Sequence, residues 1–334
     1  MRRAIRLSKR GYPAPNPRVG CVIVRDGRIV GEGWHDACGG PHAEVVALEQ
    51  AGSLARGASV YVTLEPCNHA GRTAPCSQAL IHAGVGKVCF ACPDPNPIAA
   101  GGGGALRTAG IAVEDGLLGD EARAANTRFL RAMELGRPYV VLKVAMSLDG
   151  RVTRGPGTER WITGELARRE GHRLRAECGA VLVGRGTVEA DNPRLTARLR
   201  GVRNQPLRVI LDPAGRLSPD RRVFREAGSA WNVTGPGAGG DVEIGWASPG
   251  RLDLAGLLKR LFESGQTGLL VEGGPCTWAS FLDAGLVDRI EMFVAPIVLG
   301  GGALWSEGLA TSMAFRCLRV RRLGGDLQIS LEPA

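Results

Sequence analysis

Near the start of the chain, two largely apolar runs separated by a polar turn predict a β-hairpin. Residues 19–24 and 28–34 form two runs rich in Val, Ile and Gly, and the pair Asp26-Gly27 between them is typical of a tight turn. The four glycines at 101–104 lack the Gly-Lys-Ser/Thr ending of a phosphate loop, so we expect a flexible connection there. Helices are expected at residues 2–9, 42–51, 75–83 and 118–133, and further strands at 59–63 and 87–91.

The break at Gly136-Arg137-Pro138 predicts a domain boundary. After it, apolar strands alternate with helical stretches, which is typical of an α/β sheet with helices packed on its faces. We therefore expect two domains, 1–135 and 139–334, and the Gly-rich segment 227–250 as a surface excursion. Strands are expected at 139–145, 180–183, 207–211, 269–271 and 290–294, and helices at 165–176, 252–264 and 277–284.

The formal net charge of +9 fits an anionic partner such as a phosphorylated small molecule or a dinucleotide, although solvated surface arginines explain it equally well. No run of five or six like charges marks a nucleic-acid tail. Nine cysteines scattered from Cys21 to Cys317 do not resemble a disulfide framework and indicate a reducing compartment. Because no signal peptide or membrane helix is recognisable, we expect a cytoplasmic protein without nucleic-acid or membrane partners. Homo-oligomerisation is left open.

The strongest chemical signal joins His42-Ala43-Glu44 to Pro66-Cys67 and to Cys76. One imidazole and two thiolates make a three-ligand zinc set, which leaves a fourth position for water. Zinc makes that water easier to deprotonate, and Glu44 can take its proton and pass it to a leaving amine. Positions i and i+2 do not share a helix face, so His42 and Glu44 meet one metal only if the helix points its first turn at the ion.

Two other interpretations remain at this point. His42, Cys67, His69 and Cys76 can form a closed zinc site that only staples the fold, but this leaves Glu44 without a role. The cysteines can also be simple core residues. The usual zinc-deaminase pattern has two residues between its cysteines, whereas eight separate Cys67 from Cys76.

Two longer strings, residues 16–21 (NPRVGC) and 66–76 (PCNHAGRTAPC), resemble the bifunctional deaminase–reductase family of riboflavin biosynthesis. Ala74 stands where that family usually has Pro. The resemblance implies a cytidine-deaminase-like three-layer domain, with His42, Cys67 and Cys76 as zinc ligands and Glu44 as the proton shuttle. It also implies a substrate site in which Asn16 holds the pyrimidine edge and which is lined by His69 and Arg72.

The second half has no complete dinucleotide fingerprint, because Glu189 stands where the third glycine after Gly184 and Gly186 is needed. Glu272-Gly273-Gly274-Pro275 ends an expected strand and leads into an expected helix. The N–H groups at such a helix start suit a pyrophosphate, although an ordinary strand-to-helix turn explains the string equally well. Lys143, in an apolar strand, needs a polar partner.

Residues 143–150 (KVAMSLDG), 161–163, 186–188, 191–193 and 272–275 resemble the reductase domain of the same family, which is similar to dihydrofolate reductase and uses NADPH. The resemblance implies NADPH contacts from Ala145, Trp161, Thr187, Asp191, Gly274, Pro275, Cys276, Thr277, Trp278, Ala279 and Ser280. It implies substrate contacts from Arg175, Leu195, Arg198 and Glu272. Arg175 and Arg198 carry planar guanidinium groups, which can donate paired hydrogen bonds to a phosphate, although exposed arginines are commonly only solvated.

Together these features predict a zinc-dependent deaminase joined to an NADPH-dependent reductase. By the resemblance, the first domain deaminates a diaminopyrimidinone ribosyl phosphate and the second reduces the ribosyl group to a ribityl chain. A nucleoside or nucleic-acid deaminase is disfavoured by the reductase-like half. The alternative from outside the enzymes is a binding module without catalytic activity, in which zinc only stabilises the fold.

Overall fold

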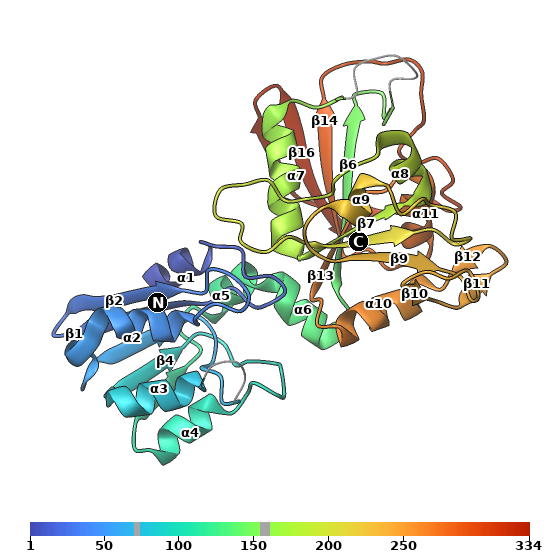
Figure 1. Cartoon of the computed structure of the whole chain (residues 1–334). Coiled ribbons are helices and arrows are strands. Elements are labelled where there is room, and N and C mark those ends of the chain that lie inside the picture. Colours follow the sequence, from blue (N-terminus) through green and yellow to red (C-terminus); the bar gives the residue numbers. More distant parts are fainter. Residues whose placement is uncertain (70–73, 154–160) are drawn as a thin grey trace. The chain divides into compact units, whose positions relative to one another are not determined.

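The computed structural model describes residues 1–69, 74–153 and 161–334 of the chain. These residues group into two compact units, Met1–Leu135 and Gly136–Ala334 (Figure 1). Each unit has its own main sheet and its own hydrophobic core. Within the described ranges, no helix combines the length and apolar character needed to cross a membrane.

The first unit is centred on a five-stranded sheet in the order β2-β1-β3-β4-β5. The predicted hairpin is present: β1 pairs antiparallel with β2, and Asp26 and Gly27 form its turn with φ of 49° and 75°. β1 also pairs antiparallel with β3, whereas β3, β4 and β5 are parallel. The strands are β1 (Gly20–Arg25), β2 (Arg28–Trp34), β3 (Ser59–Val62), β4 (Lys87–Phe90) and β5 (Ala112–Asp115).

Helices cover both faces of this sheet. Side chains from α2, α3 and α4 share one core with inward residues of β1, β3 and β4. Side chains from α1, α5 and α6 pack in smaller clusters on the other face. The three-layer arrangement expected for this unit is therefore confirmed. The helices are α1 (Arg2–Ser8), α2 (Ala43–Ala51), η1 (Gly52–Ala55), α3 (Cys76–Ala83), α4 (Gly102–Thr108), α5 (Gly119–Ala125) and α6 (Thr127–Leu135).

Glycines in β2 allow α2 to lie very close to the sheet. A Cβ built on Gly33 would lie 2.1 Å from the carbonyl oxygen of Ala43, and one on Gly31 would lie 2.2 Å from that of Ala47. Since α2 begins directly after His42 and carries Glu44, this close approach helps to position the metal-site helix.

The second unit is centred on a nine-stranded sheet in the order β10-β9-β8-β7-β13-β6-β14-β16-β15. The strands from β10 to β14 are parallel, and β16 and β15 add an antiparallel edge. The strands are β6 (Tyr139–Ser147), β7 (Ala180–Gly184), β8 (Leu207–Leu211), β9 (Ala230–Thr234), β10 (Val242–Glu243), β13 (Gly268–Val271), β14 (Arg289–Ala295), β15 (Phe315–Leu323) and β16 (Asp326–Pro333); β11 (Trp246–Ser248) and β12 (Arg251–Leu252) pair separately.

Helices also cover both faces of the second sheet. α10 and α11 contribute to one core with Val140, Leu142 and Val144 of β6, while α7 shares the opposite core with Val141. This arrangement confirms the expected α/β layering, because successive β6 side chains point to opposite faces and both faces are apolar. The helices are α7 (Glu165–Cys178), α8 (Arg185–Asp191), α9 (Arg222–Arg225), α10 (Leu254–Glu263) and α11 (Pro275–Asp283).

Three local expectations were wrong. The single helix expected at 118–133 is divided into α5 and α6 at Asn126, whose side-chain oxygen accepts a hydrogen bond from the backbone N–H of Arg18 at 3.0 Å. The flexible connection expected at 101–104 is instead the start of α4. A Cβ on Gly102 would lie 1.8 Å from the carbonyl oxygen of Pro66, so glycine permits close packing here rather than mobility.

The third wrong expectation concerns the segment 227–250, which is not only a surface excursion. Its strand β9 pairs in parallel with β8, and β10 pairs with β9 at the sheet edge. Val233 and Thr234 are buried, so the segment extends the main sheet. β5, α8 and the β15–β16 hairpin are further elements that the apolar pattern did not predict.

Candidate active sites

His42, Cys67 and Cys76 come together although they lie in three separate parts of the sequence. One potential ligand atom from each residue lies within 4.8 Å of those of the other two. His42 Nδ1 lies 3.3 Å from Cys76 Sγ and 3.5 Å from Cys67 Sγ. His42 is the extended residue before α2, and Cys76 is the first residue of α3. Two helix starts therefore converge on the site, and their N–H ends favour negative charge.

The electrostatics of the two sulfurs fit a bound cation. Hydrogen bonds from Cys76 and His42 lower the pKa of Cys67 to about 4, against the opposing effect of burial. The adjacent Cys67 sulfur and burial raise the pKa of Cys76. A divalent cation between them would allow both sulfurs to be thiolates at once, which is the state zinc requires. This donor set fits zinc.

Glu44 lies beside this group, in the first turn of α2, and its side chain is buried. The spacing problem between His42 and Glu44 is resolved because His42 precedes the helix with ψ of 160°, so α2 points its first turn at the site. Burial raises the pKa of Glu44 to about 7. A carboxyl group held near neutrality can both accept and release a proton.

The closed four-ligand alternative lacks its fourth ligand among the described residues, because His69 is not part of the metal-binding group. The Nδ1 atom of His69 is buried and has no hydrogen-bond partner within the described ranges. Arg72, the other residue expected to line this substrate site, lies outside the described residues.

Asn16 is connected to the metal group through His35, which the sequence analysis missed. The side-chain amide nitrogen of Asn16 lies 3.1 Å from His35 Nε2, and His35 Nδ1 lies 3.0 Å from the carbonyl oxygen of Pro41. The rings of His35 and His42 meet edge to face with centroids 5.2 Å apart. A lone histidine after a strand carries no local signal of such a role, so only the fold reveals it.

In the second unit, the residues expected to contact NADPH gather along the carboxyl edge of the parallel strands. Ala145 is near the end of β6, Thr187 and Asp191 belong to α8 directly after β7, and Gly274 precedes α11 directly after β13. This edge is where open α/β sheets bind ligands. Gly274 has no atom within 4 Å of an added Cβ, and no side chain caps α11, so the start of this helix suits a pyrophosphate.

The members of the expected cofactor set differ in exposure. Trp161 is 52% exposed, whereas Trp278 of α11 is buried in the hydrophobic core, and Ala279 of the same helix is buried as well. Cys276, in the first turn of α11, is exposed. Within the run from Gly274 to Ser280, a ligand can therefore reach the first turn of the helix more readily than Trp278 or Ala279.

Glu272 and Arg175 form a bidentate ion pair at the same edge. Arg175 Nε donates to Glu272 Oε1 at 2.7 Å, and Nη2 donates to Oε2 at 2.6 Å. The pair is largely buried; against the opposing effect of this burial, Arg175 lowers the pKa of Glu272. Glu272 is also the polar neighbour that Lys143 requires: burial lowers the pKa of Lys143, and the negative charge of Glu272 opposes this change.

Leu195 and Arg198 lie in the segment that follows α8. Leu195 has φ of 56° and a buried side chain in the core beside α7. Arg198 is exposed, and its Nη1 donates to the hydroxyl of Thr196 at 3.0 Å. The structure thus brings Arg175, Glu272 and Arg198 to one region through Thr196, whose carbonyl oxygen also accepts from Arg175 Nη1 at 3.0 Å.

Comparisons with known proteins find matches for both halves of the chain. Residues 1–92 match the family model of the cytidine and deoxycytidylate deaminase zinc-binding region, and residues 138–329 match that of the RibD C-terminal domain. The chain is 41% identical to the riboflavin biosynthesis protein RibD of Aquifex aeolicus, covering 98% of this chain and 96% of that protein. It is 40% identical to RibD of Escherichia coli, covering 99% and 98%.

Two solved structures are similar over the whole chain. RibD of Acinetobacter baumannii superposes with a TM-score of 0.88 at 42% identity, covering 100% of this chain and 97% of that one. A diaminohydroxyphosphoribosylaminopyrimidine deaminase/5-amino-6-(5-phosphoribosylamino)uracil reductase of Thermotoga maritima gives 0.84 at 36% identity, with the same coverage. The chain belongs to the RibD family of riboflavin-biosynthesis enzymes, with an N-terminal cytidine-deaminase-like domain and a C-terminal RibD reductase domain.

Proposed function

We propose that residues 1–135 deaminate 2,5-diamino-6-(5-phosphoribosylamino)pyrimidin-4-one, and that residues 139–334 then reduce the ribosyl group of 5-amino-6-(5-phosphoribosylamino)uracil with NADPH. The observation that carries the first half is the convergence of His42, Cys67 and Cys76 beside buried Glu44. Two relatives that match nearly the whole chain, RibD of Aquifex aeolicus and the deaminase/reductase of Thermotoga maritima, support the proposed reductase activity of residues 139–334. We place both reactions in the cytoplasm, as the scattered cysteines predict.

In the deaminase site, His42, Cys67 and Cys76 would hold zinc, which when bound activates water for attack on the ring carbon. Glu44 takes a proton at its carboxylate and releases it to the leaving amine, a role for which its raised pKa is suited. Asn16, oriented by His35, holds the polar edge of the pyrimidine, and His69 and Arg72 line the same site.

In the reductase site, the carboxyl edge of the sheet binds NADPH through Ala145, Trp161, Thr187, Asp191 and the start of α11. Glu272 would contact the substrate, and the two hydrogen bonds from Arg175 fix the position of its carboxylate. Leu195 and Arg198 complete the substrate contacts. Burial of the Arg175–Glu272 pair restricts water near it, which strengthens its electrostatic effect.

The test of this proposal uses Glu44→Gln and Cys67→Ser in the full chain, with each domain given its own substrate. Glu44→Gln preserves shape and is not at a ligand position, so zinc should remain bound while deamination falls by roughly 10²- to 10⁴-fold. Cys67→Ser should lose both zinc and deamination. Metal analysis and product identification by mass measure these outcomes.

The reductase activity is the internal control for these variants, because every motif for zinc chemistry lies before Leu135. Reduction of supplied 5-amino-6-(5-phosphoribosylamino)uracil should continue at the wild-type rate in Glu44→Gln. Loss of reduction in a variant that is still folded would contradict two independent sites. Full zinc retention in Cys67→Ser would contradict the ligand assignment.

A further inference from the structure

Glu65 is a carboxylate of the first unit that the proposed mechanism does not use. It lies two residues before Cys67, in the segment between β3 and α3. Its Oε2 accepts a hydrogen bond from the backbone N–H of Asp94 at 3.3 Å, and its Oε1 accepts one from that of Gly103 at 2.9 Å. A single side chain therefore links the two ends of the segment 94–103.

Both hydrogen bonds suit a carboxylate. Gly103 is in the first turn of α4, and the N–H groups at a helix start favour a negatively charged acceptor. The residue before this helix is Gly101, which has no side chain to cap it, so Glu65 takes this role from 38 positions away. Removing the carboxylate would take the acceptor from two backbone N–H groups at once.

The segment 94–103 reaches the surroundings of Cys67 through Ala99. Ala99 is buried in a small cluster with Cys67 and Cys76. Its carbonyl oxygen also accepts a hydrogen bond, at 2.8 Å, from the backbone N–H of Asn68, the residue directly after Cys67. The segment thus contacts both Cys67 and the residue that follows it.

The glycine run at the start of α4 brings the same segment against the residue that precedes Cys67. A Cβ on Gly102 would lie 1.8 Å from the carbonyl oxygen of Pro66, so only glycine permits this contact. Gly104, two positions further along the helix, has open space around it. The segment 94–103 is therefore fitted closely to the residues on both sides of Cys67.

Cys67 depends on such neighbours because no helix holds it. His42 directly precedes α2 and Cys76 begins α3, whereas Cys67 lies in an irregular segment. We propose that Glu65 is a positioning residue for Cys67, which it acts on by holding the segment 94–103 against the residues on both sides of this ligand. This inference rests on the proposed zinc ligands and assigns Glu65 no contact with zinc or substrate.

The test measures the zinc dissociation constant of the folded full chain by competition with a chromogenic chelator. Glu65→Ala removes both hydrogen bonds and should raise this constant by roughly ten- to 100-fold, the usual effect of losing a group that orients a metal ligand. Glu65→Gln keeps one acceptor oxygen and should recover part of the loss. Glu49→Ala removes an exposed carboxylate from α2 of the same unit, and this charge-matched control should bind zinc like wild type.

Two glycine variants test the segment 94–103 without changing Glu65. Gly102→Ala forces the backbone of α4 and that of Pro66 apart, so it should also raise the zinc dissociation constant by roughly ten-fold or more. Gly104→Ala adds the same methyl group to the same helix in open space and should keep the wild-type value.

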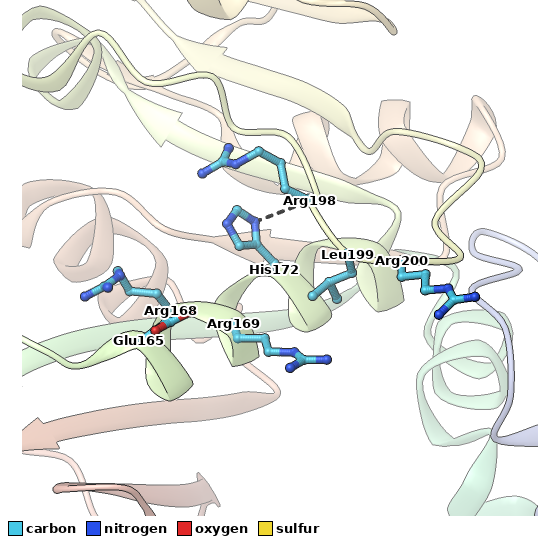
Figure 2. Close-up of a pocket in the computed structure, with 7 residues that line it drawn as sticks. All are labelled: Glu165, Arg168, Arg169, His172, Arg198, Leu199 and Arg200. Carbon is cyan, nitrogen blue, oxygen red and sulfur yellow. Dashed lines mark hydrogen bonds between the residues drawn. The ribbon is translucent and has the colours of Figure 1, made fainter.

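The second unit provides an internal reference for these variants. Its proposed substrate contacts include Arg198, which lines a groove of about 410 Å³ beside α7 (Figure 2) and lies outside the first unit. Reduction of supplied 5-amino-6-(5-phosphoribosylamino)uracil should therefore continue at the wild-type rate in every variant. A fall in reduction that matched the loss of zinc would indicate unfolding of the whole chain and would overturn the assignment to Cys67.

A purely structural Glu65 would give a different result. Glu65→Ala would then lower the free energy of unfolding of the zinc-free chain in chemical denaturation and keep the wild-type zinc dissociation constant, which would overturn the proposal. Should Glu65→Ala not fold, Glu65→Gln and Gly102→Ala decide by the same measurement. A wild-type chain that bound no zinc would overturn the proposed function and this inference with it, whereas equal zinc binding by wild type and the Glu65 variants would overturn this inference alone.

Discussion

Replacing Arg175 with Met tests whether the buried ion pair with Glu272 holds the reductase site together. The Arg175 and Glu272 side chains are only 16% and 8% exposed, so solvent screens their interaction weakly. Met retains much of the apolar stem but removes the guanidinium. The carboxylate of Glu272 then stays buried without its two hydrogen bonds.

The expected cost follows from that uncompensated charge. Removing one partner of a buried pair typically destabilises a protein by about 3–5 kcal/mol. Lys143 attracts the same carboxylate and compensates in part, so we expect a value near the lower end, about 3 kcal/mol. For a unit of this size, that corresponds to a decrease in Tm of roughly 6–12 °C.

Scanning calorimetry of the full chain at neutral pH measures this change. Arg175→Met/Glu272→Gln removes both charges and should be more stable than Arg175→Met alone. Arg260→Met breaks an exposed pair with Glu263 and should change the free energy of unfolding by less than about 0.5 kcal/mol. If the free energy of unfolding of Arg175→Met lay within about 1 kcal/mol of wild type, the reasoning from burial would be refuted.

The remaining predictions concern packing and pH. Gly33→Ala places a methyl group 2.1 Å from the carbonyl oxygen of Ala43 and should destabilise the first unit by roughly 1–3 kcal/mol. Gly104→Ala lies in open space within α4 and should instead stabilise this unit by about 0.5–1 kcal/mol. Chemical denaturation of the two variants measures both changes in the free energy of unfolding. His172 has a pKa lowered to about 4, so the unfolded chain binds a proton that the folded one excludes between about pH 6.5 and 4. Stability should therefore fall on acidification through this range, and His172→Gln should flatten that dependence; parallel pH profiles would contradict it.

Local signals in the amino-acid sequence were enough to predict the zinc set, the α/β layering and the hairpin. His42, Glu44, Cys67 and Cys76 lie in short strings whose residue types have few other uses together, and the confirmed layering follows from apolar periodicity. Each of these signals is complete within a few residues, so it can be identified without knowing what lies beside it in space.

The identity of distant partners came from the folded chain alone. Arg175 and Glu272 are 97 positions apart, and nothing near either residue indicates the other. The same is true of His35 beside Asn16, and of Thr196, whose carbonyl oxygen lies 3.0 Å from His172 Nδ1. Packing of helices and loops on the sheets, not local spacing, brings these partners together.

The wrong local expectations have the same origin. Gly102 was interpreted through its backbone freedom, but its missing Cβ makes room for the carbonyl oxygen of Pro66. The segment 227–250 looked loop-like because of its glycines, yet β9 within it pairs with β8. A glycine permits both a mobile loop and a close contact, and a short strand gains its stability from its neighbours. Pairing and burial exist only in the folded chain, and they outweigh the weak local preferences from which these two segments were first interpreted.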